Sequence, residues 1–259
     1  MTRLFEKLLR RCGIVSHKFT HSMQIVDFIN KVRCTGIDTD LIRIGGHGDG
    51  GYLLPDDLEG IGTCFSPGVD VVATFEEDLA RRGIKCFLAD HSVEDAPIKN
   101  KNIVFEKRFL GCADDDIHMR LENWFSENWD ETGDSLLQMD IEGAEYSVIL
   151  DTPRSVFARF RIMVIEFHDL EMLFSKGAFP FVQQVFDKLL QDFSVVHIHP
   201  NNNSKSVKIG DLDIPQVMEF TFYRKDRITQ SSHDLSFPHA LDIKNNPKKA
   251  DLFLPDIWH

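Results

Sequence analysis

The sequence predicts an α/β fold in which helices cover a mostly parallel, seven-stranded sheet. From Gly62 onward, short apolar runs alternate with amphipathic helical patterns, and strands separated by helices form parallel sheets with helices on both faces. Only a polar loop joins the last two apolar runs, which indicates that the last strand inserts antiparallel. A chain of 259 residues suits one substantial domain of this kind.

The periodicity of apolar residues gives each element an expected range. Helices are expected over residues 71–82, 114–128 and 179–191, the second with an acidic first turn that suits the helix dipole. Glu76 and Glu77 are expected on a solvated face of the first of these helices. The strands are expected over residues 63–66, 84–89, 102–106, 135–139, 161–167, 194–198 and 217–223.

Two flanking segments are expected around a main domain at residues 41–227. Residues 1–40 show helical spacing of apolar residues. A basic amphipathic helix at residues 2–11 is expected to pack on its own domain or in a homodimer, the alternative being a membrane surface. Residues 228–259 have little periodicity and three prolines, which predicts an irregular arm that packs on the domain or on a partner subunit.

Composition narrows the functional class. The formal charge of -12 argues against broad nucleic-acid binding, which needs clustered Lys and Arg, but it leaves a small anionic substrate open. Five widely spaced cysteines without a CxxC pair indicate free thiols in a reducing compartment. The N-terminus does not resemble a secretory signal, and no apolar run is long enough to span a membrane, so a cytoplasmic location is expected.

The segment GGHGDGGYLLPDD, residues 45–57, is unusually rich in glycine. Glycine permits positive φ angles and close approach of the backbone to a ligand. The segment is therefore expected to form either a loop that covers a ligand or a tight hairpin, and its composition does not separate the two. Tyr52, inside this segment, is a candidate contact for a substrate.

The ends of the first two predicted strands suggest a nucleoside site. In an open parallel sheet, ligands bind at the carboxyl ends of the strands, where the strand order reverses. The first strand ends in Ser66, Gly68 and Asp70, followed by a helix whose N-terminus offers free N–H groups. Asp90 ends the second strand about 20 residues past the glycine, a spacing suited to binding ribose hydroxyls, although capping of the next element is an equal alternative.

The next two strands of the pattern end in further titratable groups. Asp140 ends the fourth strand, and Glu142 is expected in the first turn of the helix that follows. Alternation along the fifth strand places Glu166 and His168 on one face. His168 is a candidate general base, or a structural histidine. Asp140, Glu166 and His168 are also ligand types used by divalent cations, although their spacing matches no metal motif.

Further candidate site residues lie at the end of the sixth predicted strand. His197 and His199 share a face, and the segment Pro200–Asn203 follows directly. Since this strand is expected to end at the same edge of the sheet, His199 and Asn202 are candidates for binding a substrate.

The segment LLQMDIEGAEYSVIL, residues 136–150, resembles the signature of the FkbM-type S-adenosylmethionine (SAM)-dependent methyltransferases. IRIGGHGDGGYLLPDDL, HIHPNNN and FPHALDIKNNP resemble other parts of that family, so the resemblance covers residues 42–251. It implies a Rossmann-like class I methyltransferase fold and methyl transfer to oxygen on a sugar or secondary metabolite. It also implies Gly68 in the cofactor loop, Asp90 at the ribose, and Asp140 and Glu142 beside the active site.

The expected enzyme is an O-methyltransferase acting on a small molecule or a nucleotide- or lipid-linked sugar. His168 would be the general base, with Asp140 and Glu166 orienting it or holding a divalent cation. Ser66, Gly68, Asp70, Asp90, Asp140 and Glu142 would bind SAM, and Tyr52, His199 and Asn202 the acceptor. The segment Ser66–Asp70 departs from the family's glycine-rich motif, which suggests as one alternative a non-catalytic module that binds SAM or S-adenosylhomocysteine (SAH). The other alternative is a nicotinamide-dependent oxidoreductase on the same sheet, which the missing GxGxxG motif after the first predicted strand disfavours.

Overall fold

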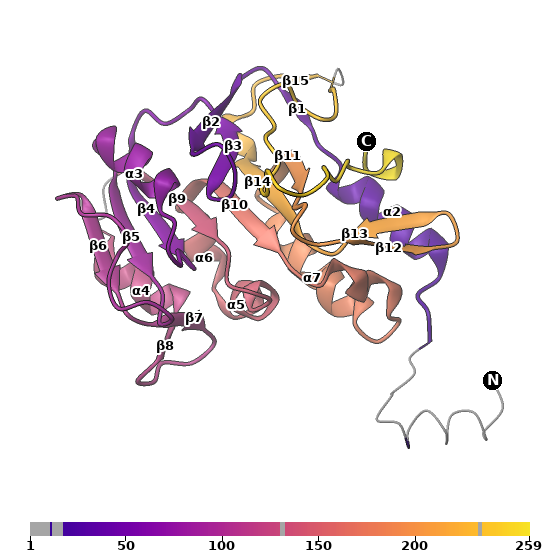
Figure 1. Ribbon diagram of the computed structural model, residues 1–259, viewed down its shortest axis with the longest axis horizontal. Coiled ribbons are helices and arrows are strands. Elements are labelled where there is room, and N and C mark those ends of the chain that lie inside the picture. The colour runs from indigo at the N-terminus through magenta and orange to yellow at the C-terminus, as the bar shows by residue number, and fades with distance from the viewer. Residues whose placement is uncertain (1–10, 12–17, 130–132, 233–234) are drawn as a thin grey trace.

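A seven-stranded sheet forms the centre of the molecule (Figure 1). The computed structural model describes residues 11, 18–129, 133–232 and 235–259. The strand order is β11-β14-β10-β9-β4-β5-β6. The strands are β4 (Ile61–Pro67), β5 (Lys85–Ala89), β6 (Ile103–Glu106), β9 (Asp134–Met139), β10 (Phe160–Phe167), β11 (Phe193–Pro200) and β14 (Met218–Arg224).

The directions of the strands agree with the prediction. The pairs β4–β5, β5–β6, β4–β9 and β9–β10 are parallel. Strand β14 is antiparallel to both of its neighbours, β10 and β11. The expected mostly parallel sheet of seven strands, with an antiparallel last strand, is therefore confirmed. The order also reverses beside β4, because β5 and β6 lie on one side of it and the later strands on the other.

The two faces of the sheet have different covers. Phe65 and Leu137 point into the larger hydrophobic core on one face of the sheet. Their neighbours Cys64 and Leu136 point into a second core on the opposite face, because successive side chains of a strand alternate between the faces. The first face carries α2 (Ser22–Val32), α4 (Leu121–Asn128), α5 (Glu145–Asp151), α6 (Arg154–Phe157) and α7 (Phe179–Leu189). The second carries α3 (Thr74–Arg81) and the hairpin β2 (Leu41–Gly45)–β3 (Gly51–Pro55).

The helix expected over residues 114–128 is only half present. Helix α4 begins at Leu121, after two short paired strands, β7 (Phe109–Gly111) and β8 (His118–Arg120). Asp115 Oδ1 accepts hydrogen bonds from the backbone N–H groups of Ile117 and His118, and Asp114 Oδ1 accepts one from that of Arg120. Short acidic side chains that bind nearby backbone in this way favour loops over helices, so the acidic run forms a loop.

Several other elements differ from the expectation. Helix α3 begins at Thr74 and not at residue 71, and the polar loop between β11 and β14 contains a hairpin, β12 (Ser206–Ile209)–β13 (Leu212–Pro215). The helix expected after β9 is present as α5, whereas the short helix α6 was not predicted. Glu142 was expected in the first turn of α5, but it precedes the helix, in a turn where its φ angle is 55° and that of Gly143 is 97°.

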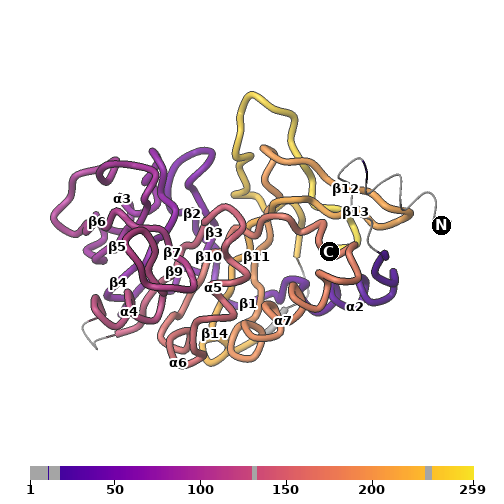
Figure 2. Tube along the Cα trace, turned by 90° about the horizontal axis from the view of Figure 1, so that it is seen from below, coloured from indigo at the N-terminus to yellow at the C-terminus, as the bar shows by residue number. Residues whose placement is uncertain are grey.

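The C-terminal arm packs on its own chain. It begins after the 3-10 turn η2 (Lys225–Arg227), pairs β15 (Ser231–Ser232) with β1 (Gly36–Ile37), and ends in the 3-10 turn η3 (Asp256–Trp258). Trp258 is fully buried in the helical core. Figure 2 shows the yellow arm beside the orange chain that includes β12 and β13. On the N-terminal side, the predicted second helix is present as α2, whereas residues 2–10 of the predicted basic helix lie outside the described residues.

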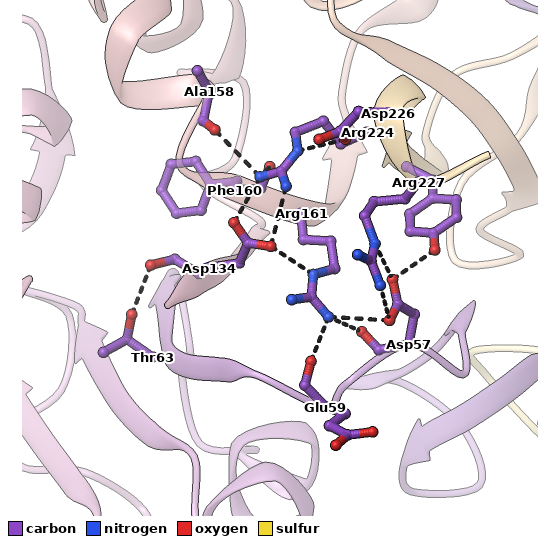
Figure 3. Close-up of polar contacts among 12 residues, drawn as sticks. Asp57, Glu59, Thr63, Asp134, Ala158, Phe160, Arg161, Arg224, Asp226 and Arg227 are labelled. Atoms are coloured by element: carbon purple, nitrogen blue, oxygen red, sulfur yellow. Dashed lines mark hydrogen bonds and ion pairs between the residues drawn. The ribbon is translucent and has the colours of Figure 1, made fainter. Parts of the chain in front are cut away.

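Ion pairs join the elements at the amino ends of the parallel strands (Figure 3). Arg161, at the start of β10, lies 2.8 Å from Asp134, at the start of β9, and 3.1 Å from Asp57, after β3. Arg224 lies 2.8 Å from Asp134, and Arg227 lies 2.9 Å from Asp57. Charges therefore hold this edge of the sheet together, at the end of the strands away from Asp140.

Two further observations bear on the sequence-based expectations. Cys34, Cys64, Cys86 and Cys112 are free thiols, and Cys64 and Cys86 are buried. Within the described part of the chain, none of the helices combines the length and the apolar character that crossing a membrane requires.

Candidate active site

A large cavity opens at the carboxyl ends of β4, β5 and β9, with a volume of about 920 Å³. It lies beside β4, where the strand order reverses, which is the usual ligand site in open α/β sheets. Of the two expected structures for the glycine-rich segment, the hairpin is present, and the segment also borders the cavity. It forms the turn of the β2–β3 hairpin, and Asp49, Gly50 and Tyr52 of that segment line the cavity.

Gly68 makes the first turn of the cavity wall. Its N–H donates to the carbonyl of Ala89, and its φ angle of 85° favours glycine. A Cβ atom at this position would lie 1.5 Å from the carbonyl oxygen of Asp140. The end of β4 therefore touches the backbone that follows β9, and no side chain fits between them.

Asp90 lies on the cavity wall at the end of β5, as the strand pattern predicted. Its Oδ2 accepts a hydrogen bond from the N–H of Asp70, and its Oδ1 accepts bonds from the N–H and hydroxyl of Ser92. A carboxylate has about four acceptor positions, so Asp90 retains capacity for a ligand. Asp70 also lines the cavity, with a φ angle of 42°.

Ser66 was expected to bind the cofactor, but it is fully buried and is not among the residues that line the cavity. Its hydroxyl lies within hydrogen-bonding distance of both Glu76 and Gln138, and Gln138 in turn donates to the Tyr52 hydroxyl. One hydroxyl has a single proton, so a neutral Glu76 that donates to Ser66 satisfies the whole chain. Burial raises the pKa of Glu76 to about 7, against the lowering effect of the bond to Ser66.

Glu76 also corrects the expectation of a solvated helix face. It is 3% exposed and lines the cavity together with Tyr52 and Gln138. Together with the buried Ser66 of β4, these side chains of α3, β3 and β9 form a hydrogen-bonded chain at the cavity wall.

Asp140 reaches the cavity from the end of β9. Its Oδ1 atom is buried and accepts no hydrogen bond from any residue that the structure describes. Burial raises the pKa of Asp140 to about 7; the charge of His168 opposes the rise, and Glu142, Glu145 and Asp49 add to it. One oxygen of this carboxylate therefore has no hydrogen bond from the described residues, next to the point where the strand order reverses.

Glu145, the first residue of α5, organises the loop between Asp140 and that helix. Its side chain is completely buried, and Oε1 accepts hydrogen bonds from the N–H groups of Ile141 and Gly143. The same oxygen lies 3.1 Å from Nδ1 of His168. Glu145 therefore fixes both the turn that carries Glu142 and the orientation of the His168 ring.

His168 lies behind Asp140 and is not among the residues that line the cavity. Its Nε2 lies 3.5 Å from Glu142, 3.6 Å from Glu166 and 3.8 Å from Asp140. Burial lowers its pKa, but the hydrogen bond with Glu145 and the charges of Glu145, Asp140 and Glu142 outweigh this and raise the pKa to about 9. The ring is thus enclosed by carboxylates behind Asp140, and the assignment of His168 as the general base stays a prediction.

Glu166 is 4% exposed, and its carboxylate accepts hydrogen bonds from Asn201. Burial raises its pKa, and the charges of Asp140 and Glu219 raise it further. Glu166 is absent from the cavity lining. The structure therefore brings the three predicted catalytic residues together, but only Asp140 faces the cavity.

His199 and Asn202 were expected to bind the acceptor, and the structure places both under the C-terminal arm. His199 lies 3.7 Å from Asp242 of the arm, and His197 lies 2.9 Å from it. The Asn202 side chain donates to the carbonyls of Asn246 and Ala250. Neither residue is among those that line the cavity, and both instead bind the arm to the sheet.

The cavity is strongly acidic. Among the described residues that line it there is no Lys or Arg, and the one histidine is His118. Its carboxylates are Asp49, Asp70, Glu76, Asp90, Asp115, Asp140 and Glu142. Such a lining attracts cationic groups and repels phosphates.

Two solved structures show a distant similarity to this chain. Among solved structures, a candidate RNA methyltransferase from Pyrococcus horikoshii is 13% identical with a TM-score of 0.35, over 64% of this chain and 75% of that one. A chain of the fibrillarin/Nop5p complex is 11% identical with a TM-score of 0.39, over 74% of this chain and 98% of that one. No curated protein sequence is similar enough to this chain to match it.

The family comparison concerns the centre of the chain. The family model of the methyltransferase FkbM domain matches residues 114–195. This range contains β9, α5 and β10, and with them Asp140, Glu142, Glu145, Glu166 and His168. The resemblance predicted from LLQMDIEGAEYSVIL is thereby confirmed over residues 114–195, which match the model of the methyltransferase FkbM domain.

Proposed function

We propose that the protein is a SAM-dependent O-methyltransferase whose cofactor and acceptor share the cavity beside β4. The observation that carries the proposal is the convergence of Gly68, Asp90 and Asp140 on one cavity at the reversal point of the sheet. The match of residues 114–195 to the FkbM domain supports methyl transfer as the reaction.

The residues present fit SAM. Asp90 lies at the end of β5, where its remaining acceptor positions can bind ribose hydroxyls. Gly68 and Asp140 both line the cavity, and because Gly68 has no side chain the two strand ends pack together without a side chain between them. SAM is a sulfonium, so when bound it supplies an activated methyl group, and its positive charge suits the acidic lining.

The chain's own residues then have to bind and orient an acceptor hydroxyl. Asp140 faces the cavity with a carboxylate that can accept the hydroxyl's hydrogen bond and so aim its oxygen at the methyl group. The Tyr52 hydroxyl, held by Gln138, contributes a second polar contact on the cavity wall. Because the described lining lacks Lys and Arg, a neutral polyol or sugar suits the cavity better than a nucleotide-linked one.

A calorimetric titration with SAH, NAD and NADP tests the proposal and separates it from a nicotinamide-dependent oxidoreductase. We expect SAH to bind with a dissociation constant below about 1 mM, and at least about tenfold more tightly than either dinucleotide. Binding of NAD or NADP in preference to SAH would show that the cavity serves hydride transfer. Binding of none of the three would contradict the proposal.

A glycine variant connects this binding to the cavity. Gly68→Ala places a methyl group against the Asp140 carbonyl and should weaken SAH binding at least about tenfold, because the turn must shift. Gly177→Ala is the matched control, since a Cβ there meets nothing within 4 Å. Circular dichroism of both variants verifies that they are folded. Equal SAH affinity in the two variants would place the binding site elsewhere.

A further inference from the structure

Three side chains at the edge of the cavity present metal-binding atoms to one another. One donor atom each from Asp140, Glu142 and His168 lies within 4.8 Å of the other two. The donors come from two segments, the turn after β9 and the residue after β10. Asp140 and Glu142 also line the cavity, so anything bound between the three donors borders on it.

Asp140 Oδ1 and His168 Nε2 belong to the two less exposed side chains of this cluster. Asp140 Oδ1 is buried without a hydrogen bond from the described residues, although it lies beside the rim of an open cavity. His168 Nε2 lies 3.5 Å from Glu142, 3.6 Å from Glu166 and 3.8 Å from Asp140. These distances exceed a normal hydrogen bond. Two neighbouring ligands at about 2.1 Å from one octahedral ion lie about 3.0 Å apart, so an ion would draw the donors slightly closer together.

His168 is oriented as metal-bound histidines usually are. Its Nδ1 lies 3.1 Å from the buried carboxylate of Glu145, which leaves Nε2 directed at Asp140 and Glu142. In metal sites, a carboxylate on the second ring nitrogen fixes the tautomer and the orientation of the ligand ring. Glu145 also binds the N–H groups of Ile141 and Gly143, so one side chain holds both ligand-bearing segments in place.

We propose that Asp140, Glu142 and His168 bind a divalent transition-metal ion, with Mn²⁺ favoured over Mg²⁺. Two carboxylates with one imidazole suit Mn²⁺, whereas Mg²⁺ prefers oxygen ligands alone. Glu166, 3.6 Å from His168 Nε2, provides further negative charge behind the ion. If the proposed methyl transfer holds, the ion would bind the acceptor hydroxyl next to Asp140 and increase its acidity. This role rests on the proposed function, whereas the ion site itself does not.

The test is titration of chelator-treated protein with Mn²⁺, followed by the electron paramagnetic resonance signal of free Mn²⁺. We expect wild-type protein to bind one ion per chain, and Mg²⁺ to compete at least about tenfold more weakly. Asp140→Asn and Glu142→Gln should each weaken binding at least about tenfold. The side chain of Glu142 is 88% exposed, so E142Q removes a ligand without disturbing the core.

Asp115→Asn is the matched control. Asp115 also lines the cavity and contacts a histidine, His118, at 3.1 Å, but it does not belong to the cluster of three donors. Its loss should leave Mn²⁺ affinity unchanged. The proposal fails if wild-type protein binds no Mn²⁺, or if E142Q and D140N bind it as tightly as D115N. In that case His168 serves only as the counter-charge of the carboxylates around it.

Titration of the same preparations with SAH keeps the two proposals separate. Protein that binds SAH but not Mn²⁺ retains the proposed function and loses the ion site. Protein that binds Mn²⁺ but not SAH loses the proposed function and retains the ion site.

Discussion

Glu76 is the residue whose surroundings differ most from what the sequence predicts. An acidic residue in an amphipathic helix is usually solvated, and its neighbour Glu77 does pair with Arg81 near the surface. Glu76 instead turns inward to Ser66 and the cavity. Helical spacing alone does not reveal this, because the partner of Glu76 comes from a strand ten residues earlier.

The buried carboxyl of Glu76 should make stability depend on pH. Its folded-state pKa of about 7 lies above the ordinary 4.5, so its contribution is complete below pH 4.5 and is lost as the pH rises to 7. Over that range the free energy of unfolding of wild-type protein should fall, relative to Glu76→Gln, by on the order of 2–3 kcal/mol. Urea denaturation at pH 5 and pH 8 measures the difference.

Glu77→Gln reports the effect of removing a carboxylate from the surface of the same helix. The account of Glu76 is wrong if wild type and E76Q lose stability in parallel between the two pH values.

The strand ends explain which site residues could be predicted from the sequence. Asp90 and Asp140 end strands β5 and β9, the two neighbours of β4, and both reach the cavity. His199 and Asn202 follow the same logic but belong to β11 and the turn after it, and β11 is three strands beyond β9. At about 4.8 Å per strand this is roughly 14 Å. Residues at the carboxyl ends of different strands therefore lie on the same side of the sheet without lining the same cavity. The order of the strands in the sheet determines which of them are close enough to do so.

At the scale of elements, the strands were more predictable than the helices. Every residue of β10 is buried, and its centre, Ile162–Ile165, is a continuous apolar run that marks it as a strand. The start of α4 was not predictable from periodicity, because Asp114 and Asp115 bind loop backbone in place of continuing the helix. The short helix α6 spans too few residues for a periodic pattern to stand out.

Hydrogen bonds of Asn202 attach the C-terminal arm to the rest of the chain, and a substitution can test this. Asn202 donates to the carbonyls of Asn246 and Ala250 and accepts from the N–H of Asn246, at 2.7 to 3.1 Å. Asn202→Ala removes all three bonds and should cost about 1–3 kcal/mol, mainly in opening of the arm. Trypsin cleavage after Lys248 and Lys249, both exposed, should therefore become faster.

Asn123→Ala is the comparison variant, because it removes an exposed hydrogen bond to Asp114 far along the chain from the arm. Cleavage of the arm at the same rate in N202A and N123A would mean that Asn202 does not hold it.

At the scale of the whole molecule, the two edges of the sheet are built differently. The amino edge pairs its carboxylates: Arg161, Arg224 and Arg227 hold the pKa values of Asp57 and Asp134 below their usual range, although burial alone would raise them. The carboxyl edge leaves its carboxylates without Lys or Arg among the described cavity residues, and there the pKa of Asp140 rises. Arginines therefore neutralise the carboxylates at the amino ends of the strands, whereas those at the carboxyl ends stay available. Perturbed, unpaired carboxylates of this kind are typical of ligand sites.

The most direct measurement is a crystal structure of the protein with SAH. The account predicts SAH in the cavity beside β4, its ribose hydroxyls within about 3.2 Å of the Asp90 carboxylate and its sulfur on the side of Asp140. SAH bound outside this cavity, or with its ribose away from Asp90, would contradict the assignment of the cavity as the methyl-transfer site.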